Sequence, residues 1–467
     1  MLRRRPLFYT LGVAIALTCC AGSSGASQPR VREYVSRPDL RPPPVKILKR
    51  TRHTSPGYVF IAPKEKVEQA GPFIIDNRGQ TVWFMPTDVR GVTDFRMQTY
   101  RGKPVLTWWR GRSEDRKRKG RYSIFDNRYR LITYVRPGNN IAGDMHEFSI
   151  TKRNTALITL SNVVRVKHRK VLEGAFQEID IKTGRVLFEW HSVGKVALVE
   201  SYYRLPKDPG KTFDYFHINS IEIDQDGHLL VSARNTHAIY KINRRTGDII
   251  WRLGGKRSDF TLGKDVRFGW QHDARRLPDR TLSLFDNAAA PKLRKQSRGL
   301  VLRLDERRMR ATLIRSFVHR PALVSVNQAN MQRLPNGHYF IGWGYKPYFT
   351  EFGPRGTIVF DGRFAWPGAR VDSYRAYRFP WVGRPAEPPR VAVERNTAYV
   401  SWNGATEVIS WELLIGSDKD KLRAVKVMPK TGFETAIPLP SGAAWVAVKA
   451  LDRKGRSLAR SNVVGRD

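Results

Sequence analysis

The sequence has little cysteine and no long helical or hydrophobic segments. Only two of its 467 residues are cysteines, Cys19 and Cys20, and a chain that loses its first 26 residues keeps neither. No disulfide is therefore expected, so burial and sheet closure must hold the fold. Stretches with helical periodicity are absent, whereas short and alternating apolar runs are common and glycine, proline and tryptophan are plentiful. This pattern indicates an all-β protein.

Several local motifs with known chemistry are also absent. There is no G-x-S-x-G elbow of a serine hydrolase and no glycine-rich phosphate loop. There is no H-x-H or H-E-x-x-H spacing, although three convergent imidazoles could still hold zinc or copper. The net charge of +41 comes without a helix-turn-helix pattern, a metal knuckle or an RNA-binding aromatic signature. We expect no cofactor and no specific nucleic-acid partner, and we attribute the charge to a solvated surface or to attraction of anions.

The first 26 residues resemble a secretory signal peptide. Arg3-Arg4-Arg5 precede an apolar run of roughly 11 residues that ends at Leu17, which is too short for a membrane span. Leu17-Thr18-Cys19-Cys20 is similar to a bacterial lipoprotein cleavage box with Cys20 as the lipidated residue, and cleavage near Ser24-Gly25-Ala26 is the alternative. The protein is expected to be exported, either attached to the cell envelope through an N-terminal lipid or released outside the cell.

A turn followed by bulky apolar residues recurs six times. The copies begin at Asp76, Asp126, Asp180, Lys241, Asp305 and Phe352. They lie roughly 48 to 63 residues apart, near the blade length of a β-propeller. Hairpin signals fall between the copies, at Asp226-Gly227, Pro278-Asp279 and Asn336-Gly337. Four strands per repeat predict a six-bladed β-propeller over residues 55–385.

The flanking segments predict a tether and a second domain. Residues 27–54 are polar and proline-rich, which is typical of a tether. Residues 373–379 look like a strand that pairs with the first blade and closes the ring. Residues 388–467 carry about seven short β runs, which favour an immunoglobulin-like or fibronectin type III-like sandwich with Trp402 or Trp411 in its core. No catalytic cluster appears in this sandwich.

Three segments between the turn copies open with a histidine: His146, His217 and His272. The first strand of each propeller blade lines the central channel, so these histidines would face one cavity. His319 precedes the sixth repeat and is a fourth candidate. Histidine can attack as a nucleophile or transfer a proton near neutral pH. The alternative for each is a histidine that only satisfies backbone groups near the axis.

Amides and guanidinium groups accompany these histidines along the chain. Asn219 follows His217 by two residues, and Arg234, Asn287 and Arg298 stand near the predicted strand ends that follow. Such groups converging on a cavity suit a tetrahedral oxyanion such as sulfate or phosphate. A surface or structural ion pair is the alternative for each arginine.

The combined motif string resembles the bacterial arylsulfotransferase family, in its secreted, actinobacterial-type branch with an appended sandwich domain. The motifs are Phe213–Ser220, Tyr240–Ile242 with Trp251–Gly255, Gln271–Arg275 with Leu284–Asn287, and Leu334–Gly337 with Gly342–Gly344. The resemblance covers about residues 55 to 380. It implies a six-bladed propeller that acts as a sulfotransferase. A sulfuryl group would pass from a small aromatic sulfate donor to a phenolic acceptor through a sulfo-histidine intermediate.

The resemblance also assigns residues, with one departure. His217 and His272 correspond to channel histidines of the family, and Asn287 and Arg298 are weaker correspondences. In the best-studied branch the modified histidine follows a glycine-rich strand in a late blade, but the comparable stretch here, 342–348, has no histidine. Either His217, His272 or His319 is the nucleophile, or this branch does different chemistry. The alternative function is that of a noncatalytic envelope propeller that binds an anionic or sulfated ligand.

Overall fold

The structure is a computed structural model that describes residues 31–88, 91–111, 120–366 and 368–466. The expected signal peptide and the lipidation site at Cys20 lie outside these residues. Within them, the regular secondary structure is β-strand throughout, apart from one 3-10 turn at Leu198–Glu200. The all-β class expected from the short apolar runs is therefore confirmed. No helix in the described ranges is long and apolar enough to cross a membrane.

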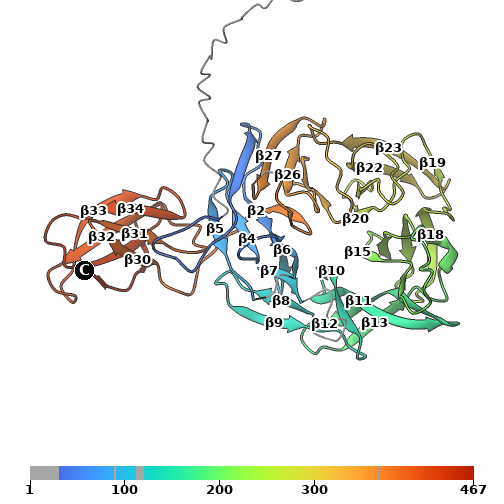
Figure 1. The fold of residues 1–467 in the computed structure, drawn as a ribbon, viewed down its shortest axis with the longest axis horizontal. Coiled ribbons are helices and arrows are strands. Elements are labelled where there is room, and N and C mark those ends of the chain that lie inside the picture. The colour runs from blue at the N-terminus through green and yellow to red at the C-terminus, as the bar shows by residue number, and fades with distance from the viewer. Residues whose placement is uncertain (1–30, 89–90, 112–119, 367, 467) are drawn as a thin grey trace, which may run out of the picture.

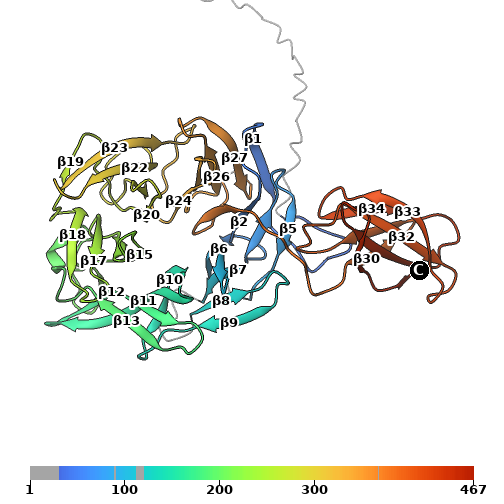
Figure 2. The same cartoon turned by 180° about the vertical axis from the view of Figure 1, so that it is seen from behind.

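Six antiparallel sheets follow one another in chain order around a common centre (Figures 1 and 2). We number them 1 to 6. Sheet 1 contains β2 (Tyr58–Ile61), β4 (Phe73–Ile75), β5 (Thr81–Phe84) and β29 (Ala376–Phe379). Sheet 2 contains β6 (Val92–Tyr100), β7 (Lys103–Arg110), β8 (Arg121–Phe125) and β9 (Leu131–Val135). Sheet 3 contains β10 (Ala142–Ile150), β11 (Thr155–Val166), β12 (Arg169–Asp180) and β13 (Val186–His191).

The other three sheets repeat this meander. Sheet 4 contains β15 (Ile218–Ile223), β16 (Leu229–Ala233), β17 (Ala238–Ile242) and β18 (Ile249–Gly254). Sheet 5 contains β20 (His272–Arg276), β21 (Leu282–Asp286), β22 (Arg298–Asp305) and β23 (Arg310–Phe317). Sheet 6 contains β24 (Asn330–Arg333), β25 (Tyr339–Gly342), β26 (Tyr348–Phe352) and β27 (Ile358–Phe364). Short strands extend the set: β14 (Phe213–Asp214) pairs with β12, β19 (Thr261–Leu262) pairs with β23, and β3 (Lys64–Glu65) pairs with β28 (Val371–Asp372).

Each of the six turns found in the sequence joins the third strand of its sheet, counted from the inner strand, to the fourth. The turn at Asp126 shows why: its Oδ1 accepts hydrogen bonds from the backbone N–H groups of Arg128 and Arg130, both at 2.9 Å. An aspartate side chain that bonds the backbone two residues on stabilises a tight turn. The apolar residues after the turn then form the outer strand, as Leu131–Val135 does.

Buried apolar side chains fill the space between neighbouring sheets. Phe60 of sheet 1, for example, shares a cluster with Trp108 of sheet 2, and Phe176 of sheet 3 shares one with Tyr240 of sheet 4. Phe360 of sheet 6 also packs with sheet 1. Sheet 6 and sheet 1 are therefore neighbours in space, although their strands β27 and β2 are far apart in the sequence.

Both ends of this region are tied into its sheets. Strand β29 pairs with β2, with Tyr377 opposite Phe60, so the pairing predicted for residues 373–379 is confirmed. The segment expected to be a tether differs from that expectation over its described part. Residues 45–50 form strand β1 (Val45–Arg50), which pairs with β27 at the edge of sheet 6. An unpaired sheet edge favours such strand addition, which the proline-rich composition did not reveal.

Residues 390–465 form two further sheets. One contains β30 (Arg390–Glu394), β31 (Thr397–Ser401) and β34 (Glu434–Pro438). The other contains β32 (Ser410–Gly416), β33 (Arg423–Pro429), β35 (Trp445–Leu451), β36 (Ser457–Arg460) and β37 (Val464–Gly465). Trp411 lies fully buried between them, and Trp402 is half-buried at the edge of this core. The connection between β31 and β32 contacts sheet 2, where the Tyr129 hydroxyl donates to the Gly404 carbonyl at 2.7 Å.

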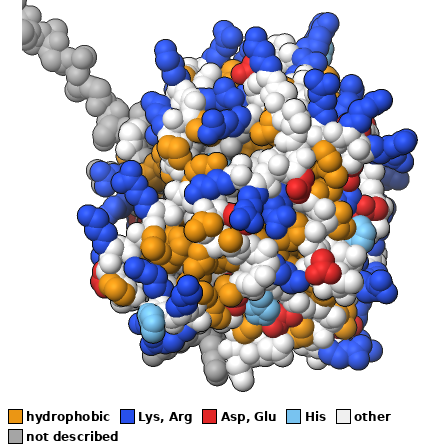
Figure 3. All heavy atoms as spheres, turned by 90° about the vertical axis from the view of Figure 1, so that its right-hand side faces the viewer, with side chains coloured by type: hydrophobic (Ala, Val, Ile, Leu, Met, Phe, Trp, Pro, Cys, Tyr) orange, Lys and Arg blue, Asp and Glu red, His pale blue; other side chains and the backbone are white. Residues whose placement is uncertain are grey.

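On the face opposite the C-terminal sheets, Lys and Arg side chains are spread out rather than gathered in one patch (Figure 3). Figure 3 shows them across the face opposite the C-terminal sheets, with few acidic side chains between them. This distribution agrees with the net charge of +41 and with the scatter of basic residues along the sequence.

Candidate active site

The innermost strands of four sheets are bulged near their first residues. The register shifts between Thr93 and Arg96 in β6, between Gly143 and Phe148 in β10, between Ile218 and Ser220 in β15, and between His272 and Arg275 in β20. A bulge re-aims side chains and is common beside active sites. It is at these bulges that the predicted residues His146, Asn219 and His272 stand.

His146 and His217 contact each other directly. Their Nε2 atoms lie 3.0 Å apart, and the rings meet edge to face with centroids separated by 4.6 Å. On its other side, His217 Nδ1 lies 2.5 Å from Asp214 Oδ2, and His146 Nδ1 bonds Asp144 Oδ2. The result is a chain of four side chains, Asp144–His146–His217–Asp214. Both rings are mostly buried, with 14% of each side chain exposed.

This geometry fixes the protons of the pair. A carboxylate only accepts hydrogen bonds, so the Nδ1 of each ring carries a proton. Two Nε2 atoms in hydrogen-bond contact need one donor and one acceptor, so one further proton is shared between them. One ring is then an imidazolium and the other is neutral. Burial, followed by the charge of Arg234, lowers the pKa of His217 to about 4, so His217 is the neutral ring.

The backbone conformation of His217 supports a functional role for this residue. Its φ is +62°, in the left-handed region that residues other than glycine seldom occupy. Such conformations cost free energy and cluster at functional sites. Here the conformation lets His217 turn between Asp214, three residues earlier, and His146 on the neighbouring sheet.

His272 is close to the pair but has different partners. Its Nδ1 donates to the Asn287 side-chain oxygen at 2.8 Å, and its Nε2 accepts the backbone N–H of Gln328 at 3.2 Å. The ring is 1% exposed. Burial lowers the pKa of His272 well below its ordinary value, and the charge of Arg234 lowers it further. His272 is therefore a neutral ring with both nitrogens occupied.

Arg234 is the cation next to these rings. Its guanidinium stacks on Trp270 at 4.4 Å from the ring centroid, and its Nε donates to Asn235 Oδ1 at 2.9 Å. The nearest carboxylate oxygen, on Asp214, lies 3.8 Å away. Because Arg234 lowers the pKa of both His217 and His272, its charge reaches both rings. A guanidinium with donors to spare beside neutral imidazoles can receive an oxyanion.

The two predicted asparagines hold this arrangement from behind. The Asn219 side chain donates to the Gln271 carbonyl at 2.7 Å, next to His272, and its Oδ1 is buried without a partner in the described chain. Asn287 accepts from His272 and donates to the Ser325 and Gln328 carbonyls. Both amides therefore fix the position of His272 and of the segment that bonds its Nε2.

The structure does not bring two of the predicted residues to this cluster. Arg298 Nε donates to Asp286 at 3.0 Å, and its NH2 donates to the carbonyls of Asp265 and Arg267, so it joins neighbouring loops of sheet 5. His319 bonds the Pro321 carbonyl and Asp361 and lies against Trp343 within sheet 6. Arg298 thus forms a structural ion pair, the alternative expected for each arginine, and His319 is a buried partner of Asp361.

Two functional residues were missed by the sequence reasoning. Asp144 and Asp214 orient the histidine pair, and neither was singled out. The signal was present: an aspartate precedes His146 by two residues and His217 by three. Asp214 was even part of a quoted motif, but nothing in the sequence shows that a carboxylate at that distance turns back toward the ring.

A buried ion network lies beneath the cluster, on the axis of the ring. Arg375 is completely buried and pairs with Asp94 at 2.7 Å and with Glu147 at 3.3 Å. Its NH2 also donates to the Asn219 carbonyl at 2.8 Å. Arg96 and Arg275 bond the same Glu147. The network fills the centre and connects the bulges of four sheets.

A small cavity of about 60 Å³ adjoins the histidine pair. Asp144, Asp214 and Glu173 line it, so this side of the rings carries negative charge. These carboxylates repel an anion, and the guanidinium of Arg234, 3.8 Å from Asp214, offsets part of their charge. In the described ranges, no group of three or more His, Cys, Asp or Glu side chains is arranged to hold a metal ion.

Known proteins were compared with the chain. Its solved neighbours include a protein of unknown function from Bacteroides caccae (13% identity, 69% of this chain and 98% of that chain, TM-score 0.42). They also include a catalytically inactive virginiamycin B lyase from Staphylococcus aureus with quinupristin (11% identity, 77% and 96%, TM-score 0.36). No curated protein matches. The arylsulfotransferase (ASST) family model matches residues 96–365, more than half of the chain and the part that carries the histidine cluster. The chain therefore belongs to the arylsulfotransferase family.

Proposed function

We propose that this protein transfers a sulfuryl group from a phenolic sulfate ester to a phenolic acceptor. The observation that carries the proposal is the 3.0 Å contact between His146 and His217, with a carboxylate behind each ring and Arg234 beside them. It supplies a neutral nucleophile, a proton and a fixed cation at one place. Membership of the arylsulfotransferase family supports the reaction class.

His217 is the proposed nucleophile. Its pKa of about 4 keeps the ring neutral at pH 7, and Asp214 holds the proton on Nδ1, so the lone pair is on Nε2. His272 fits this role less well, because a backbone N–H, that of Gln328, bonds its Nε2, whereas the Nε2 of His217 bonds only a side chain that can turn away, that of His146. His146 carries the shared proton and is the proposed acid.

The reaction then balances in two steps. In the first, His217 Nε2 forms a bond to sulfur, the bond from sulfur to the phenolic oxygen breaks, and His146 gives its proton to the departing oxygen. In the second, the acceptor hydroxyl attacks sulfur, its proton returns to His146, and the bond from nitrogen to sulfur breaks. The sulfuryl group waits on His217 between the steps, so the kinetics should be ping-pong.

Arg234 is proposed to bind the sulfuryl oxygens. Its guanidinium can donate paired hydrogen bonds, and it is the main charge acting on His217 and His272 after burial. Fixed donors aimed at charge that develops in the transition state lower the barrier. Asn219, whose Oδ1 lacks a partner in the described chain, keeps His272 in place at the same site.

The test is release of p-nitrophenol from p-nitrophenyl sulfate, with and without a phenol acceptor. Wild-type protein should release it in an acceptor-dependent manner, and His217→Ala and His146→Ala should each lose at least about 100-fold in kcat/KM. His168→Ala, which changes an exposed histidine in the β11–β12 turn, is the matched control and should be unaffected. Full activity in His217→Ala would refute the proposed nucleophile.

The second candidate is a noncatalytic protein that binds an anionic or sulfated ligand at this site. It is favoured by the fact that His272 has both ring nitrogens bonded. The same assay separates the two candidates. Folded wild-type protein that binds p-nitrophenyl sulfate but releases no p-nitrophenol with any phenol would support ligand binding.

We also propose the remaining architecture and location. Six successive sheets, the packing of sheet 6 on sheet 1 and the β2–β29 pairing support a closed six-bladed β-propeller over residues 55–385. The two sheets around Trp411 support an immunoglobulin-like or fibronectin type III-like domain over 388–467. The N-terminal sequence supports export, with lipidation at Cys20 or simple secretion. Mass measurement of protein purified from its host distinguishes the last two.

A further inference from the structure

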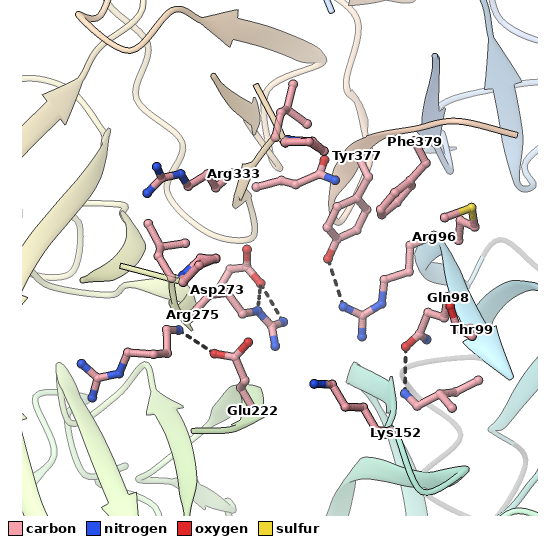
Figure 4. Close-up of a pocket in the computed structure, with 18 of the residues that line it drawn as sticks. Arg96, Gln98, Thr99, Lys152, Glu222, Asp273, Arg275, Arg333, Tyr377 and Phe379 are labelled. Atoms are coloured by element: carbon pink, nitrogen blue, oxygen red, sulfur yellow. Dashed lines mark hydrogen bonds and ion pairs between the residues drawn. The ribbon is translucent and has the colours of Figure 1, made fainter. Parts of the chain in front are cut away.

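A large cavity of about 1050 Å³ lies at the other end of the central strands. His217 and His272 stand beside the starts of β15 and β20 and His146 stands in the bulge of β10, whereas this cavity is lined by the ends of the inner strands. Ile150 closes β10, Arg276 closes β20 and Arg333 closes β24 on its wall. We call it the distal cavity. Figure 4 shows its side chains converging from several sheets.

The buried ion network separates the distal cavity from the histidine pair. Arg96 and Arg275 face the cavity on one side and bond Glu147 on the other. Arg375, which is completely buried, lies behind them and reaches the Asn219 carbonyl. No residue of the Asp144–His146–His217–Asp214 chain lines the distal cavity. It is therefore a different site from the proposed sulfuryl site.

Some cationic side chains of this cavity keep hydrogen-bond donors that no described residue occupies. Arg96 is 8% exposed, and its Nε has no partner in the described chain. Lys152 stands at the rim, with no ion pair among the described residues. Arg333 at the opposite rim has one carboxylate partner, Asp279, at 2.5 Å. Cations with unused donors, here the buried Arg96 and the exposed Lys152, attract an anion.

The rest of the wall is suited to an apolar body. Tyr377 and Phe379, two residues of β29, stack on each other with centroids 5.5 Å apart and face the cavity. Met331 and Leu277 add aliphatic surface. Ligand pockets of roughly 300–1000 Å³ with apolar walls and a few placed polar groups are typical of small-molecule sites. The distal cavity has about this size, and charged and polar side chains share its wall with the apolar ones.

We propose that the distal cavity binds an organic anion with an aromatic body, at a site separate from the histidine cluster. The anionic group lies toward Arg96 and Lys152, and the ring lies against Tyr377 and Phe379. The proposal does not depend on sulfuryl transfer, because none of these residues takes part in the proposed reaction.

Glu222 makes the distal cavity sensitive to pH. Burial raises the pKa of Glu222 to about 7, and the facing charges are Arg275 and Asp273 from β20 and Glu147 from β10. Above pH 7 an ionised Glu222 repels an anion, and below pH 7 the protonated acid does not. Affinity for the anion should therefore rise as the pH falls from 8 to 6.

The test uses naphthalene-2-sulfonate, an aromatic anion whose carbon–sulfur bond cannot donate a sulfuryl group. Binding is measured by calorimetry at physiological salt, which screens nonspecific attraction to the basic surface. Thr99→Trp places an indole in the cavity from an exposed strand position, and Lys152→Glu reverses a rim charge. Each should weaken binding by about fivefold or more. Glu222→Gln should bind equally well at pH 6 and pH 8.

Two controls separate this proposal from the proposed reaction. Lys182→Glu makes the same charge change at an exposed turn position outside the distal cavity and should leave binding unchanged. Because an aryl sulfonate resembles the proposed substrate, the titration is repeated in Arg234→Ala, which impairs the sulfuryl site and should keep binding by the distal cavity. The proposal is overturned if the probe does not bind, if both Thr99→Trp and Lys152→Glu bind like wild type, or if Arg234→Ala alone abolishes binding.

Discussion

His146 Nε2 lies 3.0 Å from His217 Nε2, and each ring is held from behind by its own carboxylate. Because both Nδ1 atoms carry protons, the pair shares a single additional proton. The two rings therefore act as one unit, in which one ring is charged and the other is neutral. This relationship assigns opposite roles to two residues of the same type.

Replacing Asp214 with asparagine should disrupt the tautomer of His217. An amide can donate to Nδ1, which would move the proton to Nε2 and remove the lone pair that attacks sulfur. We expect kcat to fall by about 10²- to 10⁴-fold with little change in KM. Steady-state kinetics with p-nitrophenyl sulfate measure this split.

Asp214→Glu and Asp248→Asn are the controls for that prediction. The glutamate keeps an acceptor and should restore part of the activity, whereas an exposed surface aspartate should not matter. Equal losses of kcat in Asp214→Asn and Asp214→Glu, with equal loss of stability, would indicate a structural role instead.

Arg234→Met should raise the pKa of His217 from about 4 toward its ordinary value of about 6.5. After burial, the positive charge of Arg234 is the main influence that disfavours protonation of this ring. NMR titration of the ring protons measures the change. Arg204→Met, an exposed arginine in the preceding loop, should leave the pKa where it is. An unchanged value in Arg234→Met would mean that the guanidinium does not act on His217.

Sequence patterns predicted the repeat better than they predicted the side-chain contacts. Turn residues such as Asp126 act locally, so the hairpins could be read from the chain, and His146, His217 and His272 followed from their equivalent places in the repeat. Arg298 and His319 stand at comparable places, but loop geometry directs them to Asp286 and Asp361. Such choices depend on packing between segments far apart in sequence.

Other features were hidden for the same physical reason. Asp144 and Asp214 matter only because bulged strands turn them toward the rings. Arg375 lies within the predicted strand 373–379, yet it pairs with Asp94 of sheet 2 and Glu147 of sheet 3. Neither relationship has a local sequence spacing that would reveal it.

His237 should make the protein less stable in mild acid. Burial lowers its pKa to about 4, so the unfolded chain takes up a proton below pH 6.5 while the folded chain does not. Stability is therefore lost as the pH falls from 6.5 toward 4, by about 2 kcal/mol at pH 5 for this group. His237→Gln should reduce the difference in urea midpoint between pH 7 and pH 5. His168→Gln, at an exposed turn, should not, and an identical pH dependence in both variants would contradict the prediction.

Arg375→Met should destabilise the fold strongly. The arginine is fully buried between Asp94 and Glu147, and its removal leaves buried carboxylates without a partner. Breaking a buried ion pair costs about 3 to 5 kcal/mol. Urea unfolding measures the loss. Arg308→Met removes a bridge whose arginine is 85% exposed and should change stability by less than about 1 kcal/mol. Similar small losses in both variants would show that the central network contributes little.

The most direct test of the account is to trap the sulfuryl group on the enzyme. Protein incubated with p-nitrophenyl sulfate but no acceptor is quenched at alkaline pH, digested and analysed by mass spectrometry. We predict one added sulfuryl group on the peptide that contains His217, its disappearance when phenol is added before the quench, and its absence in His217→Asn. Rapid turnover with the group on a different residue, or with no modified peptide at all, would contradict the account.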